Sequence, residues 1–254
     1  MKEVKLYNND KIKLQGLLYY HDCYKYWDLN NCKKAFENDY PNLPSLINLD
    51  GSLPGRRGVH NELYPMCVIE LGDYNNSYQE YYSSLSRNIK RDEQSSKKKK
   101  YYFKEYNFNH NISDFVEINL SKKNINPWYY KSKDYFKNSH SGYTHQWEDD
   151  LHYSKWYGIF KYYKHYKQDG LTTNEKLFGY CKIAYDGEAA IVHLIFGHEN
   201  NLSDGIMSHL MLSIAEECFQ NKNIKYLIYG SWKEKDFLWK SRFLYKKQKI
   251  KYIL

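Results

Sequence analysis

The feature that most constrains the fold is a change of hydrophobic period between Ile191 and Phe219. The segment IVHLIFGHENNLSDGIMSHLMLSIAEECF begins with an apolar run, typical of a buried strand, and ends with apolar residues at helical spacing. The period changes around Asp204 and Gly205. A strand, a turn and a helix N-terminus must therefore follow one another. Because a helix N-terminus presents unpaired backbone N–H groups and a positive dipole end, the turn is either an anion site or ordinary α/β scaffolding.

The segments on either side extend this pattern. Before it, YGIFKYY, LFGYCKIAY and EAAIVHLIFG read as strands, and a tight Asp186–Gly187 turn joins the last two, so a three-strand meander is predicted. The strand from Ile191 to Gly197 should be central and pair with Leu177–Tyr185. After the helix that ends near Phe219, we expect a strand IKYLIYGSW, a helix EKDFLWKSRFLYKK and a last strand KIKYIL.

The region from Ser77 reads first as helix. Apolar residues recur there at intervals of three and four and predict one amphipathic helix with a basic flank; they are Tyr78, Tyr81, Leu85 and Ile89. A strand YYFKEYNF and a short helix NISDFVEINLSKKN follow. Residues 126–150 show no clear period and are predicted to form a long loop, which is often functional.

The chain divides into a small β-rich N-terminal segment, residues 1–76, and a larger unit, residues 77–254. The first carries the strand-like runs VKLYN, IKLQGLLYY and MCVIEL. In its loop, Arg56 and Arg57 lie between Gly55 and Gly58, which suits either a solvated turn or a site for phosphate or carboxylate.

Charge favours an anionic partner. The net charge of +8 over 254 residues suits nucleic acid, a nucleotide cofactor or an anionic lipid surface. The run Lys97–Lys100 is either a solvated helix end or part of a phosphate-binding patch. Five cysteines without a C-x-x-C pair predict reduced thiols, with no disulfide framework and no metal site. No apolar stretch approaches the length of a membrane span, and the first residues lack a signal peptide, so a cytoplasmic protein is expected.

The order helix, helix, three antiparallel strands, helix, strand, helix, strand resembles the GNAT acyltransferase superfamily over residues 77–254. The segments LSRNIKRD, EINLSKKN, KWYGIF, GEAAIVHLIFGHENNLSDGIMSHLML and IKYLIYGSW resemble bacterial and phage GNAT-like proteins. Similar folds occur in Fem-type aminoacyltransferases and in Mom-type phage DNA-modification proteins. The resemblance implies an α/β (α+β) fold with a mixed, largely antiparallel central sheet flanked by helices.

The resemblance also implies a donor site. In members that use acetyl-CoA or another acyl-CoA, the strand before the turn splays from its neighbour, and a loop Q/R-x-x-G-x-G/A presents N–H groups to the pyrophosphate. The equivalent loop here is HENNLSDGIM, and its donor-binding residues would be Ser203, Asp204, Gly205, Ile206 and Met207. The Arg or Gln is missing, and Asp204 adds a negative charge where the anion would bind. Ser203 and Asp204 are alternatively a helix N-cap. Gly205→Val should abolish donor binding in a folded protein.

Acyl transfer to an amine needs a proton acceptor and an acid for the leaving group. His193 and His198 are the candidate bases; their odd separation puts them on opposite faces of a strand unless a bulge intervenes. His198 is preferred because it follows the strand end, although either can be structural. The resemblance implies a tyrosine acid on the last helix, where Trp239 stands and Tyr245 is displaced, so Tyr229 is the nearest substitute.

Two functions remain open. The first is a transferase that moves an acyl or aminoacyl group from a CoA-type or aminoacyl-tRNA donor, held at Gly205, to a small-molecule or macromolecular amine lying over the loop at 126–150. The second is a GNAT-like protein that binds or modifies nucleic acid without acetyl-CoA chemistry. It would use phosphate contacts from Lys97–Lys100, Arg56 and Arg57 and stacking on exposed Tyr and Trp residues.

Overall fold

The structure is a computed structural model that describes residues 2–5, 65–122, 152–168, 171–186, 188–231 and 234–253. The predictions made for Arg56, Arg57 and the loop at 126–150 lie outside these residues.

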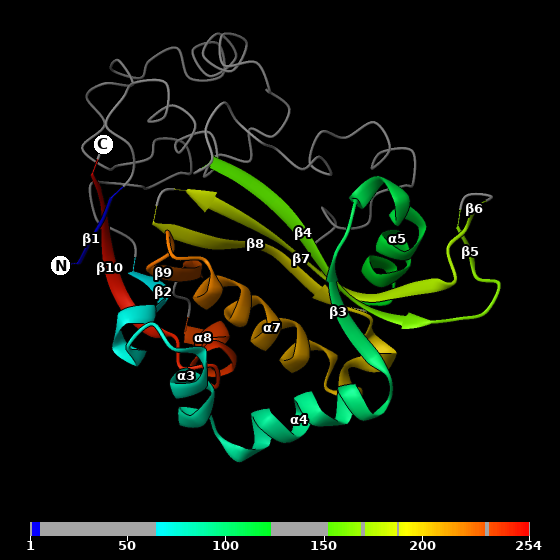
Figure 1. Ribbon diagram of the computed structural model, residues 1–254, viewed down its shortest axis with the longest axis horizontal. Coiled ribbons are helices and arrows are strands. Elements are labelled where there is room, and N and C mark those ends of the chain that lie inside the picture. Colours follow the sequence, from blue (N-terminus) through cyan, green and yellow to red (C-terminus); the bar gives the residue numbers. More distant parts are fainter. Residues whose placement is uncertain are drawn as a thin grey trace, which may run out of the picture.

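One sheet of eight strands organises the molecule (Figure 1). In spatial order, the strands are β1 (Lys2–Lys5), β10 (Lys246–Ile253), β2 (Pro65–Glu70), β9 (Tyr226–Ser231), β8 (Ala189–Gly197), β7 (Glu175–Asp186), β4 (His152–Tyr162) and β3 (Tyr101–Glu105). Neighbours pair antiparallel except β1 with β10 and β8 with β9, which are parallel. Two short strands, β5 (Lys167–Gln168) and β6 (Leu171–Thr172), form a separate hairpin between β4 and β7.

Helices cover both faces of this sheet. The helices packed into the larger core are α3 (Tyr78–Ser84), α4 (Arg87–Lys98) and α7 (Ile206–Gln220), and α5 (Ile112–Leu120) packs into a second core. Tyr157 of β4 belongs to the first core and its neighbour Trp156 to the second. Because consecutive strand residues point to opposite faces, the two cores lie on opposite sides of the sheet. The remaining elements are η2 (Leu71–Tyr74), η3 (Phe108–His110), η6 (Glu199–Asp204) and α8 (Glu234–Ser241).

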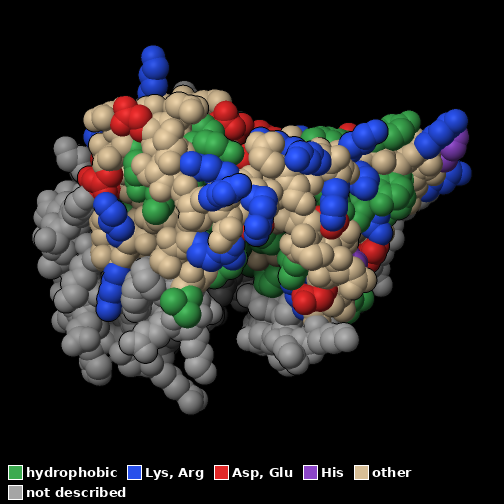
Figure 2. All heavy atoms as spheres, turned by 90° about the horizontal axis from the view of Figure 1, so that it is seen from below, with side chains coloured by type: hydrophobic (Ala, Val, Ile, Leu, Met, Phe, Trp, Pro, Cys, Tyr) green, Lys and Arg blue, Asp and Glu red, His purple; other side chains and the backbone are tan. Residues whose placement is uncertain are grey.

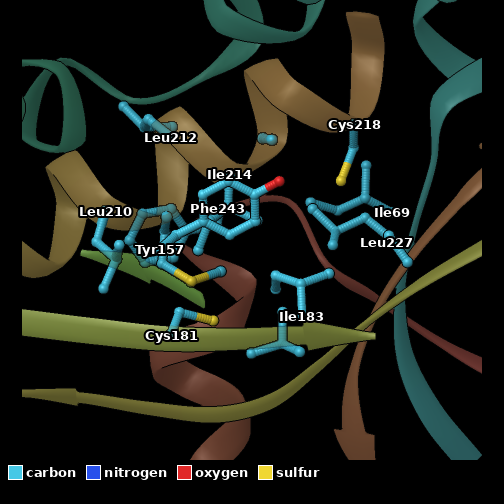
Figure 3. Packing of buried hydrophobic residues seen from close by; sticks show 14 of the residues in the cluster. Ile69, Tyr157, Cys181, Ile183, Leu210, Leu212, Ile214, Cys218, Leu227 and Phe243 are labelled. Atoms are coloured by element: carbon cyan, nitrogen blue, oxygen red, sulfur yellow. The ribbon is translucent and has the colours of Figure 1, made fainter. Parts of the chain in front are cut away.

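The larger core shows why α7 forms where the period changes. Leu210 and Ile214 of α7 lie one turn apart and pack towards Cys181 and Ile183 of β7 (Figure 3). All four side chains are fully buried. Tyrosines contribute too: Tyr81 of α3 is buried and donates its hydroxyl to the carbonyl of Phe243 at 3.0 Å.

The structure confirms the predicted fold class, a mixed and largely antiparallel sheet flanked by helices. It also confirms the meander: β8 is central and pairs with β7, with Asp186 opposite Ala189. None of the described helices is long and apolar enough to span a membrane.

Two predicted helices were too long. The first breaks at Leu85, whose backbone is extended, and a new helix begins at Arg87. The residue before it, Ser86, accepts a hydrogen bond from the N–H of Ile89 through its hydroxyl. Ser86 is thus an N-cap, which could not be recognised because the apolar residues keep a helical spacing across it. The last helix ends at Ser241 instead of continuing through LYKK, because Lys246 already begins β10.

The N-terminal segment contributes to the main sheet. β2 lies between β9 and β10, with Val68 opposite Ile228. Cys67, Val68 and Ile69 are buried there. The boundary at residue 77 stays a prediction, although residues 65–70 pair with strands from the end of the chain.

Candidate functional site

The sheet opens between its two central strands. β8 and β9 pair over only three positions, from Ala189 opposite Tyr226 to Ile191 opposite Ile228. Both strands continue, β8 to Gly197 and β9 to Ser231, without further pairing between them among the described residues. The edge of β8 beyond Ile191 that faces β9 therefore presents backbone groups that need partners.

A β-bulge lies in the same part of β8. Leu194 is opposite Lys182 of β7, whereas Val192 is opposite Ile183, so His193 is the extra residue. A bulge of this kind re-aims the side chains that follow it and often lies next to a functional site. It also meets the condition under which His193 and His198 need not point to opposite faces. The side chain of His193 lies outside the described residues.

The loop after β8 leads directly into α7. Residues 199–204 form the short helix η6, and Gly205 is the N-cap of α7 with φ +83° and no side-chain capping bond. The alternative in which Ser203 or Asp204 caps the helix is therefore wrong. Helix geometry leaves the N–H groups of Ile206, Met207 and Ser208 without intrahelical partners.

Asp204 turns away from the helix and pairs with two other groups. Its carboxylate accepts from the hydroxyl of Tyr101 at 2.8 Å and from the amine of Lys99. Burial alone would raise the pKa of Asp204, but the hydrogen bonds from Lys99 and Tyr101 outweigh it and lower the pKa below its usual value. The negative charge that Asp204 places beside the predicted anion site is thus balanced by a lysine.

Gly205 is needed for helix packing. A Cβ atom at this position would lie 1.9 Å from the carbonyl oxygen of Asp92 on α4. The positive φ adds strain for any other residue. Gly205→Val would therefore disturb the packing of α4 as well as any donor site, because α4 already occupies the space that glycine opens.

The two residues after Gly205 anchor the start of α7. Ile206 is fully buried, and Met207 is half-buried against the larger core. A Cβ atom added to Gly197 would lie 2.5 Å from the sulfur of Met207, so this helix start packs directly on the end of β8. Donor binding by residues 203–207 stays a prediction.

His198 lies on the α5 side of the sheet. Its Nε2 atom is 3.4 Å from a carboxylate oxygen of Glu117, which also accepts from Lys176 at 2.7 Å. Its backbone N–H donates to the carbonyl of Phe178 at 2.7 Å and extends β8 by one residue. Within the described part of the chain, its buried Nδ1 atom has no hydrogen-bond partner. His198 is thus held in a polar cluster, and its role as base stays a prediction.

Tyr229 lies on the other side, in an aromatic cluster. Its ring centroid is 5.7 Å from that of Trp239 and 6.0 Å from that of Tyr245, and the amine of Lys240 lies 4.4 Å above the ring. Tyr229 packs against the α7-side core, whereas His198 contacts α5. The structure therefore does not bring the two candidate groups together. Tyr245 is buried, and burial raises the pKa of its hydroxyl far above its usual value.

The sequence analysis missed Lys182, which lies next to the bulge. This β7 residue is 1% exposed and lies on the α5 side, with its amine 5.5 Å from the Trp156 ring centroid. Burial lowers its pKa to about 7. A signal was present: in the strand LFGYCKIAY, Lys182 alternates with Tyr180 and Ala184 on a face that is otherwise apolar. A buried amine close to neutrality can take up a proton from a substrate.

Comparisons with known proteins bear on the fold. No protein-family model matches the chain, and no curated protein matches its sequence. The solved structure of FemX is similar, with a TM-score of 0.54 and 7% identity, over 73% of this chain and 59% of FemX. L-PGS from Bacillus licheniformis gives a TM-score of 0.44 and 9% identity over 73% of this chain and 57% of that one. The chain thus spans less than two thirds of the length of FemX and of L-PGS. The likeness concerns the fold alone: the chain folds as FemX does over the matched part.

Proposed function

We propose that the chain is a GNAT-like transferase that moves an acyl or aminoacyl group from a CoA-type or aminoacyl-tRNA donor to an amine acceptor. The observation that supports this most is the opening between β8 and β9 after Ile191 and Ile228. An extended donor chain can bond to the free edge of β8 in the way an added strand does. The N-terminus of α7 follows the end of that strand and favours negative charge.

The residues of the loop fit an anionic donor in part. The N–H groups of Ile206 and Met207 and the positive end of the α7 dipole can hold a phosphate. The loop itself has no arginine or glutamine, and the space opened by Gly205 is filled by Asp92. The structure therefore gives two degrees of support for a donor site. The opening in the sheet supports binding of the acyl-bearing arm of the donor well, whereas the loop gives weaker support for binding of a pyrophosphate. When bound, the donor would supply an acyl thioester or an acyl ester.

The acceptor must lose a proton before it attacks. A protonated amine transfers one proton to a neutral base, and the freed amine then forms a bond to the acyl carbon while the bond to the donor sulfur or oxygen breaks. The second amine proton leaves with that sulfur or oxygen, and the base returns its proton to solvent. Lys182, one strand from the splayed edge and beside the bulge, suits the base best, ahead of His198 and His193. Tyr229 lies on the other side of the sheet and is not placed to act together with Lys182, so no acid is assigned and the leaving group takes its proton from the amine.

Isothermal titration against coenzyme A, acetyl-CoA and aminoacyl-tRNA tests this proposal. At least one of them should bind the wild type at or below millimolar concentration. Ile195 is half-buried and lies in the part of β8 that pairs with β7 but not with β9, so it is the residue to enlarge. Ile195→Trp should weaken donor binding at least tenfold while thermal unfolding stays cooperative. The control Leu120→Trp, on an exposed residue at the end of α5, should bind as the wild type does. If none of the donors binds, the transferase proposal fails.

A further inference from the structure

Two basic segments that are far apart in the sequence meet at the edge of the sheet. β3 pairs with β4, with Tyr101 opposite Lys161. Lys100 directly precedes Tyr101, so the lysine run that ends α4 lies beside the point where β4 leaves the sheet. We call α4, the turn at Lys99–Lys100 and the projecting arm of residues 161–168 the basic surface. Figure 2 shows lysine and arginine side chains along this face and at the end of the arm.

Positive charge on the basic surface is only partly neutralised. Lys97 pairs with Glu93, Lys99 with Asp204, and Asp92 with Arg242. No carboxylate among the described residues pairs with the other cations, which are Arg87, Lys90, Arg91, Lys98, Lys100, Lys161, Lys164 and Lys167.

Elsewhere on the described surface, lysines are usually matched by acids. The pairs there are Lys104–Glu175, Lys122–Glu199, Lys155–Glu105, Lys176–Glu117, Lys225–Glu188 and Lys246–Asp73. The unmatched charge is therefore concentrated on the basic surface, which favours a partner that carries several negative charges along its length.

The arm also presents aromatic rings to solvent. Tyr162 is 62% exposed and Tyr163 is 42% exposed. Tyr163 is held in place, because its ring stacks on Phe178 at 5.9 Å and its N–H donates to the carbonyl of Asn174. The neighbouring turn is fixed by the N–H of His165, which donates to the side chain of Asn174 at 3.0 Å. The rings thus stand on an ordered backbone and lose little entropy on binding.

We infer that the basic surface binds single-stranded nucleic acid, with phosphates on the lysines of α4 and the arm and a base stacked on Tyr163, which lies on the α4 side of the sheet next to Phe178. Single-strand binding requires two features. One is a row of lysines that contacts the phosphate backbone of the nucleic acid, and the other is a set of exposed aromatic rings on which any base can stack. A duplex would use the charge but not the rings, since its bases are already stacked. The inference rests on this surface alone and does not depend on the transferase chemistry.

Fluorescence anisotropy with a labelled 20-nucleotide oligo(U) and oligo(dT), and with a duplex of equal length, tests the inference on the full chain. Both single strands should bind at 50 mM salt, and more tightly than the duplex. Tyr163→Ala should weaken single-strand binding about fivefold to 100-fold and leave the slope of log affinity against log salt unchanged, because stacking releases no counterions.

A triple variant tests the charges. Lys98→Gln, Lys164→Gln and Lys167→Gln together should reduce the salt slope by about 2, since each lost phosphate contact to a single strand removes about 0.7. Lys222→Gln is the matched control, because Lys222 is exposed and lies in the turn after α7, outside the basic surface. It should leave affinity and slope unchanged. All four positions are exposed, so folding should be retained.

Three results would overturn the inference. These are no binding of either oligonucleotide at 50 mM salt, equal loss of affinity for Lys222→Gln and the triple variant, or tighter binding to the duplex with no effect of Tyr163→Ala. Binding to vesicles of anionic phospholipid in place of oligonucleotides would likewise assign the surface to a membrane.

Discussion

The Nδ1 atom of His209 on α7 lies 3.0 Å from the hydroxyl of Ser96 on α4, and both side chains are buried between the two helices. Burial, with a smaller contribution from the charge of Lys97, lowers the pKa of His209 to about 4. The neutral imidazole is therefore part of the interface that places α4 against the start of α7.

This relationship predicts a pH-dependent stability. The unfolded chain takes up a proton near pH 6.5, whereas the folded protein resists protonation until about pH 4. The free energy of unfolding should thus fall as the pH decreases through this window, by about 2 kcal/mol between pH 6.5 and 5. Urea unfolding of wild type and His209→Gln across these pH values measures the difference. If the free energy of unfolding depends on pH in the same way for wild type and His209→Gln, His209 does not cause the loss of stability at low pH.

Gly205 provides a second stability prediction. Gly205→Ala should lower the free energy of unfolding by about 3 kcal/mol or more, because the added Cβ atom meets the Asp92 carbonyl and the positive φ is strained. Gly72→Ala is the matched control, since nothing lies within 4 Å of a Cβ atom there, and it should stay within about 0.5 kcal/mol of wild type. Equal denaturation midpoints for the two variants would contradict the packing argument.

The order of elements could be predicted because it depends on local patterns. The apolar run before Gly197, the tight turn after Asp186 and the helical spacing after Gly205 are all properties of neighbouring residues. The insertion of β2 between β9 and β10 could not be predicted, because it joins segments separated by more than 150 residues through pairing alone.

The site was predictable only in part for the same reason. The sequence singles out the turn at Gly205, but not Asp92, whose carbonyl explains the glycine. From the sequence, His193 and His198 can share a face of the strand only if a bulge lies between them. The register of β7 and β8 shows such a bulge at His193. The partners of Asp204 lie in the turn after α4 and on β3, about 100 positions away along the chain, so its charge balance depends on tertiary contacts.

That charge balance predicts opposite effects of two substitutions on donor binding. Asp204→Asn removes the negative charge and leaves Lys99 free to attract an anion, so it should tighten binding of coenzyme A. Lys99→Gln leaves the carboxylate unopposed and should weaken binding. Each change should be about threefold to tenfold, because the pair is partly exposed. Isothermal titration measures both, and a shift in the same direction for the two variants would remove Asp204 from the donor site.

Replacing Lys182 distinguishes a catalytic role of this lysine from a structural one. The two roles predict opposite effects of the replacement on the free energy of unfolding. Burying its amine disfavours the charged form, so the folded pKa is about 7 against 10.5 in the unfolded chain. The free energy of unfolding should rise between pH 7 and 9 by about 2–3 kcal/mol, since only the unfolded chain keeps the proton there. Lys182→Met should flatten this rise and stabilise the protein at pH 7 by about 1–3 kcal/mol.

The same variant tests catalysis. Donor binding to Lys182→Met should persist, while the rate of transfer to the amine falls at least 100-fold. Lys182→Arg should not restore the rate, because the arginine side chain stays protonated. A destabilised Lys182→Met variant with full transfer activity would instead make the lysine a structural partner.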